Sequence, residues 1–189
     1  AEKKNALEAA GEGKVIFSYE ESYGYMLGDY VRDKDAVTAS LLLTEMAAWY
    51  QSQGMTLFDA LQALYEKYGY YGEKTHNLVM PGLDGLEKMA ALMKNLRDVP
   101  PTEIAGVAVT ARTDYKDGTI TDCTTGQVTA SELKGSNVLR YTLADGTVIL
   151  VRPSGTEPKI KVYILTKGAD AAERDANLEK YSAWVKTLA

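Results

Sequence analysis

A short polar segment, RPSGTEPKIK at residues 152–161, concentrates cations and hydroxyls in a chain whose net charge is −5. Arg152 has a planar fork of N–H donors that can pair bidentately with a phosphate or a carboxylate. Ser154 and Thr156 add hydroxyl groups, and Gly155 lets the backbone turn its amide groups toward a bound anion. These residue types favour an anion-binding loop.

The rest of the segment adds stiffness and charge. Pro153 and Pro158 restrict the backbone and so lower the entropy cost of ordering the loop around a ligand. Lys159 and Lys161 alternate onto one face of the strand that follows, whereas Glu157 has the wrong sign and is expected to point away. The alternative interpretation is a solvated strand connection, because Ser, Gly, Thr and Pro are common loop residues. From these residues alone, both interpretations stay open.

The composition excludes several classes of protein. A chain of 189 residues can form one large or two small domains, at roughly 100–200 residues per domain. A negative net charge without a sustained basic stripe argues against nucleic acid as the main partner. The longest apolar run, around 39–43, is far shorter than the ~20 residues of a membrane span, and no signal peptide opens the sequence. The single cysteine, Cys123, excludes an internal disulfide and suits a reducing compartment. We therefore expect a cytoplasmic protein that binds neither membrane nor nucleic acid.

The first half of the chain is predicted to be mainly helical. Residues 1–11 form a helix that ends at Gly11, and residues 14–19 have the pattern of a short buried strand. The helix predicted over 35–53 is apolar nearly all round, apart from Glu45, and should be buried on most sides. Further helices are predicted from the Thr56 and Asp59 capping box to Gly69 and over 84–97, with a strand at 75–80 between them.

The paired prolines at 100–101 mark the predicted domain boundary, because proline lacks a donor and favours extended backbone. Beyond them the hydrophobic period changes to two, which indicates strands. Asp145 and Gly146 are typical of a hairpin turn, and an amphipathic helix that begins at Asp170 closes the chain. The second half is therefore expected to be an α+β domain, an antiparallel sheet with a helix on one side. The expected strands cover residues 106–115, 119–126, a hairpin over 137–152, and 159–166.

The string RPSGTEPKIKVY at 152–163 resembles the C-terminal phosphate-binding loop of the α-D-phosphohexomutases, the phosphoglucomutase and phosphomannomutase superfamily. The match is specific, because it covers the whole Arg-x-Ser-Gly-Thr-Glu-Pro pattern. The resemblance implies a further basic phosphate contact at Lys161. It also implies that the phosphate that does not react is held by Arg152, Ser154, Gly155 and Thr156.

A second polar stretch, YEESYGY at 19–25, is similar to the sugar-specificity loop of the same superfamily, and RDKD at 32–35 resembles its Arg-Glu-Lys-Asp stretch. The resemblance implies sugar contacts from Glu20 and Ser22 and a further substrate contact from Lys34. A carboxylate suits this role, because its two oxygens can accept from two neighbouring sugar hydroxyls. The alternative is a charged loop that leads into a helix, with an aspartate of RDKD as the N-cap.

The resemblance covers nearly the whole chain and implies a two-part fold. Residues 1–98 would be the C-terminal part of domain 3, an α/β partial domain with the sugar-binding loop and helices. Residues 99–189 would be domain 4, a TATA-box-binding-protein-like α+β domain that binds phosphate.

Two motifs of the superfamily do not occur in this sequence. Phosphohexomutases carry a phosphorylated serine in a Thr-Ala-Ser-His-Asn-Pro-like loop and a magnesium loop of the Asp-x-Asp-x-Asp-Arg type. The segment KTHNLV at 74–79 lacks both the serine and the proline, so His76 is expected to be a surface or packing residue. We therefore expect neither a catalytic residue nor a metal ligand in this chain.

The resemblance implies that an enzyme phosphoserine phosphorylates a hexose monophosphate and that the bisphosphate then reorients and returns its other phosphate. This chain is expected to be the C-terminal substrate-binding portion and to be inactive alone, whereas Mg²⁺ and a sugar bisphosphate activator serve the full-length enzyme. The expected partners are a phosphosugar and the N-terminal domains of the same protein, with a dimer through the exposed edge of domain 3 as a further expectation. The alternative is a stand-alone phosphosugar-binding or interaction module without catalysis. Glucose, mannose and pentose phosphates all stay open as substrates.

Overall fold

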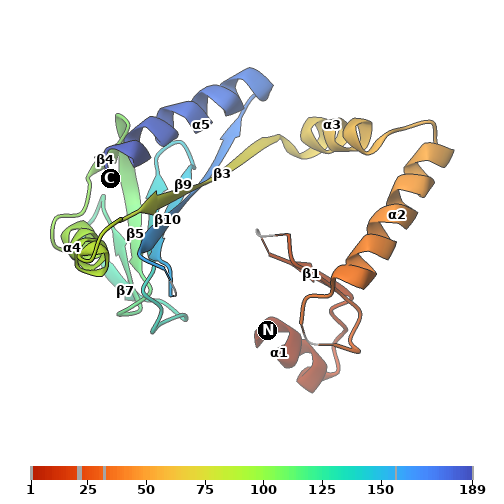
Figure 1. The fold of residues 1–189 in the computed structure, drawn as a ribbon, viewed down its shortest axis with the longest axis horizontal. Coiled ribbons are helices and arrows are strands. Elements are labelled where there is room, and N and C mark those ends of the chain that lie inside the picture. The colour runs from red at the N-terminus through yellow and green to blue at the C-terminus, as the bar shows by residue number, and fades with distance from the viewer. Residues whose placement is uncertain (1, 21–22, 32, 156, 189) are drawn as a thin grey trace. The chain divides into compact units, whose positions relative to one another are not determined.

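The computed structural model describes residues 2–20, 23–31, 33–155 and 157–188 (Figure 1). The chain divides into two compact units, Ala1–Leu64 and Tyr65–Ala189. The domain boundary predicted between residues 98 and 99 lies well after this division. The units divide earlier because residues 70–98 give the second unit an edge strand and a helix that packs on its core.

The first unit combines helices with a two-stranded sheet. It comprises α1 (Glu2–Ala10), β1 (Phe17–Tyr19), β2 (Tyr25–Leu27), α2 (Ala36–Ser52) and the start of α3 (Leu57–Tyr68). β1 and β2 pair antiparallel, with Phe17 opposite Leu27 and Tyr19 opposite Tyr25. The rings of Phe17, Tyr19 and Tyr25 lie 5.8–6.4 Å apart, so aromatic contacts stabilise this short hairpin.

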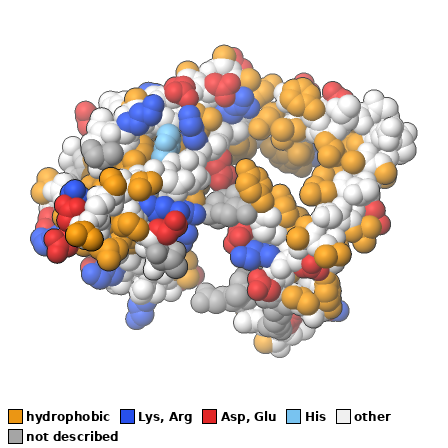
Figure 2. Space-filling model, viewed as in Figure 1, with side chains coloured by type: hydrophobic (Ala, Val, Ile, Leu, Met, Phe, Trp, Pro, Cys, Tyr) orange, Lys and Arg blue, Asp and Glu red, His pale blue; other side chains and the backbone are white. Residues whose placement is uncertain are grey.

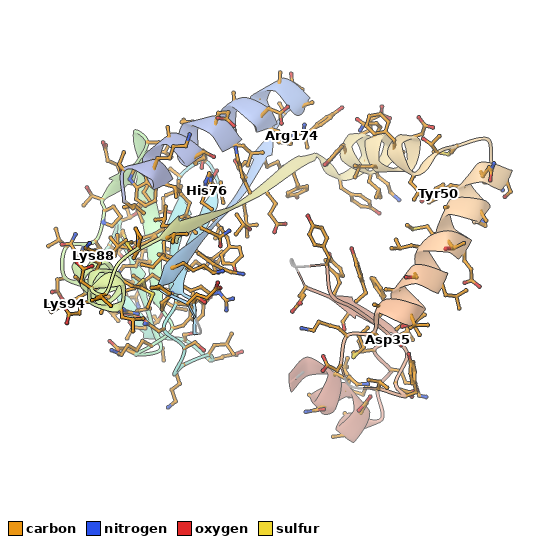
Figure 3. The ribbon with its side chains drawn as sticks, viewed as in Figure 1. Asp35, Tyr50, His76, Lys88, Lys94 and Arg174 are labelled. Atoms are coloured by element: carbon orange, nitrogen blue, oxygen red, sulfur yellow. The ribbon has the colours of Figure 1, made fainter. Side chains whose placement is uncertain are left out.

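The helix ends follow the capping signals of the sequence. Asp35, at the start of α2 (Figure 3), accepts from the Val37 N–H at 2.9 Å and is the N-cap expected within RDKD. The Thr56 hydroxyl oxygen accepts from the Asp59 N–H at 3.1 Å, and the Asp59 carboxylate accepts from the Thr56 N–H at 2.8 Å. The predicted capping box is therefore confirmed. Gly54 has a φ of 73°, a left-handed conformation that favours glycine after a helix.

Helix α2 is exposed, so the expectation that it is buried on most sides is wrong. None of its residues is buried, and Val37, Leu41 and Trp49 are 78%, 57% and 59% exposed. Figure 2 shows apolar side chains on the surface of this helix. The described part of the first unit holds only two strands of three residues each, which is too little sheet to cover an apolar helix.

The second unit is built on an eight-stranded sheet in which every pairing is antiparallel. The strand order is β3-β10-β9-β8-β5-β6-β7, and β4 pairs with β5. The predicted Asp145–Gly146 turn joins β8 to β9, with Gly146 at a φ of 82°. The strand predicted at 75–80 corresponds to the second half of β3, and β4 and β7 were not predicted. The strands are β3 (Tyr70–Val79), β4 (Glu103–Ile104), β5 (Val107–Asp114), β6 (Thr119–Asp122), β7 (Val128–Ala130), β8 (Leu139–Leu143), β9 (Val148–Pro153) and β10 (Lys159–Gly168).

Two helices, α4 (Gly85–Asp98) and α5 (Ala171–Lys186), cover one face of this sheet (Figure 1). Met93 and Leu96 of α4 and Tyr181 of α5 belong to one buried cluster with Val151 and Val162 of the sheet. Because side chains alternate along a strand, the residues between these sheet positions point to the opposite face. Among the described helices, none is both long and apolar enough to span a membrane.

Candidate functional site

The loop between β1 and β2 forms one side of a pocket in the first unit, called here the Glu20 pocket. The Glu20 N–H donates to the Gly24 carbonyl at 2.9 Å and closes the loop, and the Asp35 N–H donates to the Tyr25 carbonyl at 2.9 Å. These backbone bonds bring together two side chains that are 14 residues apart in sequence: Lys34 Nζ lies 3.1 Å from Glu20 Oε1. Two of the three predicted sugar contacts are therefore neighbours.

The Glu20 pocket has a volume of about 310 Å³. Glu20 and Lys34 both line it, together with Lys4 and Asn5 of α1, which the sequence analysis missed. Lys4 is only 7% exposed, and its Nζ lies 2.8 Å from Glu8 Oε1. A lysine and a glutamate four residues apart are common on any surface helix, so the sequence carried no signal that this lysine lines a pocket.

Gly24 makes room for the ion pair in this pocket. A Cβ at this position would lie 2.3 Å from Lys34 Cδ and 2.7 Å from Glu20 Oε1. Any side chain at Gly24 would therefore displace both groups, which explains why the loop has a glycine there.

The second candidate site is the turn from β9 to β10, residues 152–161, called here the Arg152 loop. Arg152 lies directly opposite Lys161, so the two side chains share the sheet face opposite α4 and α5. The Ser154 N–H donates to the Lys159 carbonyl at 2.8 Å, which extends the hairpin by one bond. The structure thus brings Arg152, Ser154 and Lys161 together at one end of the sheet.

Three further predicted contacts remain, a sugar contact at Ser22 and phosphate contacts at Gly155 and Thr156 of the Arg152 loop. Ser22 and Thr156 lie outside the residues that the structure describes. The backbone of Gly155 is not in the left-handed region, and a Cβ there would meet nothing within 4 Å. The described packing around this position therefore does not require a glycine.

Two cations of the Arg152 loop, Lys159 and Arg152, have different partners. Lys159 forms an ion pair with Glu157, so a carboxylate balances its charge. Arg152 instead donates from Nε to the Tyr163 hydroxyl at 3.2 Å, and its guanidinium carbon lies 5.9 Å from the centre of the Tyr163 ring. Tyr163 is not among the predicted site residues, although strand alternation places it on the same face as Lys161.

The connection from β3 to α4 supports the Arg152 loop from one side. The Met80 N–H donates to the Pro158 carbonyl at 2.8 Å. Gly85, the first residue of α4, packs so closely that a Cβ would lie 2.2 Å from the Met80 carbonyl oxygen and 3.1 Å from Pro158 Cβ. Pro158 is therefore held in place by backbone groups of another segment.

The single histidine of the chain, His76, belongs to neither candidate site and contacts α5. His76 Nε2 is 2.9 Å from the Ser182 hydroxyl of α5, and Ser182 is only 1% exposed (Figure 3). Burial lowers the pKa of His76 below its usual value, and the nearby Lys74 and Lys186 lower it further. This environment agrees with the packing role expected for His76.

Both candidate sites fall within segments that match known protein families. Residues 3–68 match "Phosphoglucomutase/phosphomannomutase, alpha/beta/alpha domain III", and residues 77–177 match "Phosphoglucomutase/phosphomannomutase, C-terminal domain". The second match alone covers more than half of the 189 residues. The chain belongs to the phosphoglucomutase/phosphomannomutase family. The Glu20 pocket lies in the domain III match and the Arg152 loop in the C-terminal domain match, so the resemblance and the two-part fold class are confirmed.

Relatives within this family are long proteins. A phosphoglucomutase from Staphylococcus aureus is 39% identical over 156 residues, which are 81% of this chain and 28% of the relative. A phosphoglucomutase from Staphylococcus haemolyticus is 39% identical over 149 residues, 79% of this chain and 27% of the relative. The chain therefore spans a little over a quarter of the length of these relatives.

A solved structure supports the same fold. The open form of pp63/parafusin, a phosphoglucomutase from Paramecium, superposes with a TM-score of 0.56 at 18% sequence identity. The match covers 97% of this chain and 32% of the other. At this identity the similarity is informative for the fold alone.

Family resemblance implies magnesium, but the described part of this chain offers no donor set for it. Among the residues described, no group of three or more His, Cys, Asp or Glu side chains could hold a metal ion. Asp35 already accepts from the Val37 N–H and from the Tyr30 hydroxyl, in keeping with a helix cap. No chemical step is therefore assigned to a metal here.

Proposed function

We propose that this chain is the substrate-binding portion of a phosphohexomutase, an isomerase that moves a phosphoryl group between C1 and C6 of a hexose through a bisphosphate intermediate. The observation that carries the proposal is the placement of Arg152 opposite Lys161, beside Ser154, within the family's C-terminal domain. Phosphoryl transfer depends mostly on positioning and on charge stabilisation. In this role the chain binds and orients the substrate, and the reacting phosphoryl group comes from elsewhere.

The Arg152 loop is proposed to hold the phosphate that is not reacting. The Arg152 fork pairs with two phosphate oxygens, and Lys161 adds a second positive charge from the facing strand. Ser154 donates its hydroxyl, and the open space at Gly155 lets a phosphate oxygen approach the backbone. By resemblance, Thr156 completes the set. Such a multidentate site suits a reaction in which each of the two phosphates of the intermediate must be bound there at a different stage.

The Glu20 pocket is proposed to hold the sugar hydroxyls. Glu20 accepts from neighbouring hydroxyls, and Lys34, 3.1 Å from it, donates to a sugar oxygen or orients the carboxylate. Ser22 is a third contact by resemblance. A carboxylate accepts from hydroxyls in either binding orientation, which a mechanism with a reorienting bisphosphate requires.

We further propose that the chain acts as part of a longer cytoplasmic protein. It spans only 28% of its Staphylococcus aureus relative, and neither the phosphoserine motif nor the magnesium motif occurs in its sequence. The exposed apolar side chains of α2 need a cover, and the remainder of domain III in the same protein is the proposed one. The alternative is a dimer in which a second copy of the chain covers the apolar side chains of α2. Mg²⁺ and a sugar bisphosphate activator act in the full-length enzyme in this proposal.

A turnover assay tests the catalytic part of this proposal. The 189-residue chain, supplied with glucose 1-phosphate, glucose 1,6-bisphosphate and Mg²⁺, should show no mutase activity. Adding the missing domains as part of one polypeptide should restore it. Clear turnover by the chain alone would overturn the proposal that this chain only binds the substrate and that the reacting phosphoryl group comes from other domains.

Calorimetry with glucose 1,6-bisphosphate tests the binding part. Arg152→Ala should weaken the affinity strongly while leaving it measurable, whereas Lys167→Ala, on the same sheet face but at the other end of β10, should leave it unchanged. Equal heats for wild type and Arg152→Ala would exclude the Arg152 loop as the phosphate site. Binding together with inactivity of the full-length polypeptide would favour a non-catalytic phosphosugar-binding module instead.

A further inference from the structure

The contact between Arg152 and Tyr163 sets the direction of the arginine. Arg152 Nε donates to the Tyr163 hydroxyl at 3.2 Å, and the guanidinium carbon lies 5.9 Å from the ring centre. The tyrosine is only 9% exposed, whereas Arg152 is exposed. A buried ring on a ten-residue strand is a fixed support, and it holds a flexible, exposed side chain by two kinds of contact.

The strand register explains why these two residues meet. Arg152 faces Lys161 across β9 and β10, and Tyr163 comes two positions later on the same strand as Lys161. Residues two apart on a strand point to the same face, so Tyr163 is a diagonal neighbour of Arg152 on the face that carries the proposed phosphate site.

The hydrogen bond also determines which edge of the guanidinium faces a ligand. Arginine has five N–H donors in a rigid plane, one on Nε and four on the two terminal nitrogens. Because Nε donates to the Tyr163 hydroxyl, the side-on edge that includes Nε is engaged by the protein. The other edge that can bind a phosphate bidentately is the end-on edge, formed by Nη1 and Nη2.

We propose that Tyr163 is a positioning residue that orients Arg152 so that its Nη1–Nη2 edge binds the substrate's non-reacting phosphate. This inference rests on the proposed function of the Arg152 loop and gives a role to Tyr163, to which the phosphate-loop resemblance assigns none. The tyrosine lowers the entropy that Arg152 loses on binding, because the side chain is already held before the ligand arrives. In this role Tyr163 acts on the phosphate through Arg152.

A double-mutant cycle tests this role with the 189-residue chain and glucose 1,6-bisphosphate, by calorimetry at low ionic strength. Tyr163→Phe keeps the buried ring and removes the hydroxyl, and it should weaken binding about three- to tenfold, the range expected for one hydrogen bond. Tyr71→Phe, an exposed tyrosine on the same sheet face, should bind as wild type. In the Arg152→Ala background, Tyr163→Phe should have no further effect, which a general structural role of Tyr163 would not predict.

The outcomes separate this inference from the proposed function. If Arg152→Ala binds far more weakly than wild type, but Tyr163→Phe binds as wild type, the positioning role is excluded and the phosphate site stands. An equal loss from Tyr163→Phe with and without Arg152 excludes the positioning role as well. If wild type shows no binding, the proposed function fails and the inference fails with it.

A second measurement does not depend on affinity. In nitrogen-15 NMR spectra of the free chain, the Nε proton of Arg152 should exchange slowly with water in wild type and rapidly in Tyr163→Phe. Equal exchange rates in the two proteins would overturn the orienting contact.

Discussion

Lys34 Nζ lies 3.1 Å from Glu20 Oε1, and both residues line a pocket of about 310 Å³. Their side chains are 51% and 41% exposed, and an ion pair this open to solvent contributes only about 0–1 kcal/mol to stability. The pair therefore contributes little to the stability of the fold, and its proposed role is to bind the sugar. A sugar hydroxyl can donate to Glu20 and accept from Lys34 at once.

Lys34→Met tests this role. Removing the ammonium while keeping the length of the side chain should weaken binding of glucose 1,6-bisphosphate about ten- to a hundredfold, because a hydrogen bond to a charged group is lost. The midpoint of thermal unfolding should stay nearly unchanged. Lys14→Met is the matched control, since Lys14 pairs with Asp29 at 3.0 Å and is also exposed, but neither residue lines the Glu20 pocket. Equal loss of affinity in the two variants would point to a general charge effect and not to this pocket.

Gly85→Ala is expected to destabilise the second unit by about 1–3 kcal/mol, the range for overpacking. The new methyl group would lie 2.2 Å from the Met80 carbonyl oxygen, so the backbone must move. Alanine favours a helix over glycine by about 1 kcal/mol, so a net loss would show that the clash outweighs propensity. Urea denaturation measures the change in the free energy of unfolding.

Gly155→Ala is the control for that experiment, because a Cβ at Gly155 meets nothing within 4 Å. Its free energy of unfolding should stay within about 0.5 kcal/mol of wild type. Gly85→Ala should also weaken binding at the Arg152 loop, since its displacement reaches Pro158. A Gly85→Ala protein as stable as wild type would contradict the close packing described here.

The structural features that depend on residues close together in sequence were predicted correctly. The capping residues of α2 and α3, the Asp145–Gly146 turn and the alternation along β10 all depend on neighbours in sequence, and the structure agrees with each. Both candidate loops were found in the same way, because RPSGTEPKIK and EESYGY are continuous strings.

Tertiary features were missed for an equally physical reason. The prolines at 100–101 were chosen as a boundary, yet pairing of β3 with β10 along residues 70–79 places the division before them. Strand partners so far apart in sequence leave no local pattern. The apolar pattern of α2 shows that the helix needs a cover, but a pattern cannot say which segment or which chain supplies it. Likewise, Lys4 lines the Glu20 pocket only because of tertiary contacts, which no local pattern predicts.

The stability of the chain should depend on pH through His76. Burial, followed by Lys74 and Lys186, lowers the pKa of His76 below its usual value of 6.5, so the folded state favours the neutral ring. The unfolded chain then binds more protons between the two pKa values. The contribution of neutral His76 is therefore complete above about pH 6.5 and is lost as the pH falls through the folded pKa.

His76→Gln should remove this part of the pH dependence of the free energy of unfolding between about pH 7.5 and about pH 5.5. Because the chain has a single histidine, its imidazole proton signals can be followed by NMR without ambiguity. Lys186→Met should raise the His76 pKa, and Lys88→Met, on α4, should not. A His76 pKa at or above 6.5 in wild type would contradict the role assigned to burial.

The ion pair between Arg97 of α4 and Asp114 of β5 should matter far more for stability than the exposed pairs. Arg97 Nε lies 2.7 Å from Asp114 Oδ2, and the side chains are only 18% and 11% exposed. Burial acts to raise the pKa of Asp114, but the bonds from Arg97 and from the Lys116 N–H outweigh it and lower the pKa.

Arg97→Met leaves that carboxylate buried without its partner, so it should reduce the free energy of unfolding by about 3–5 kcal/mol. Lys94→Met, on the same helix, breaks a pair with Asp98 whose side chains are 76% and 54% exposed, and it should change the free energy of unfolding by less than about 1 kcal/mol. Urea denaturation of the two variants and of wild type measures these changes in the free energy of unfolding. Similar midpoints would mean that α4 is held to the sheet by its apolar contacts with Met93 and Leu96 alone.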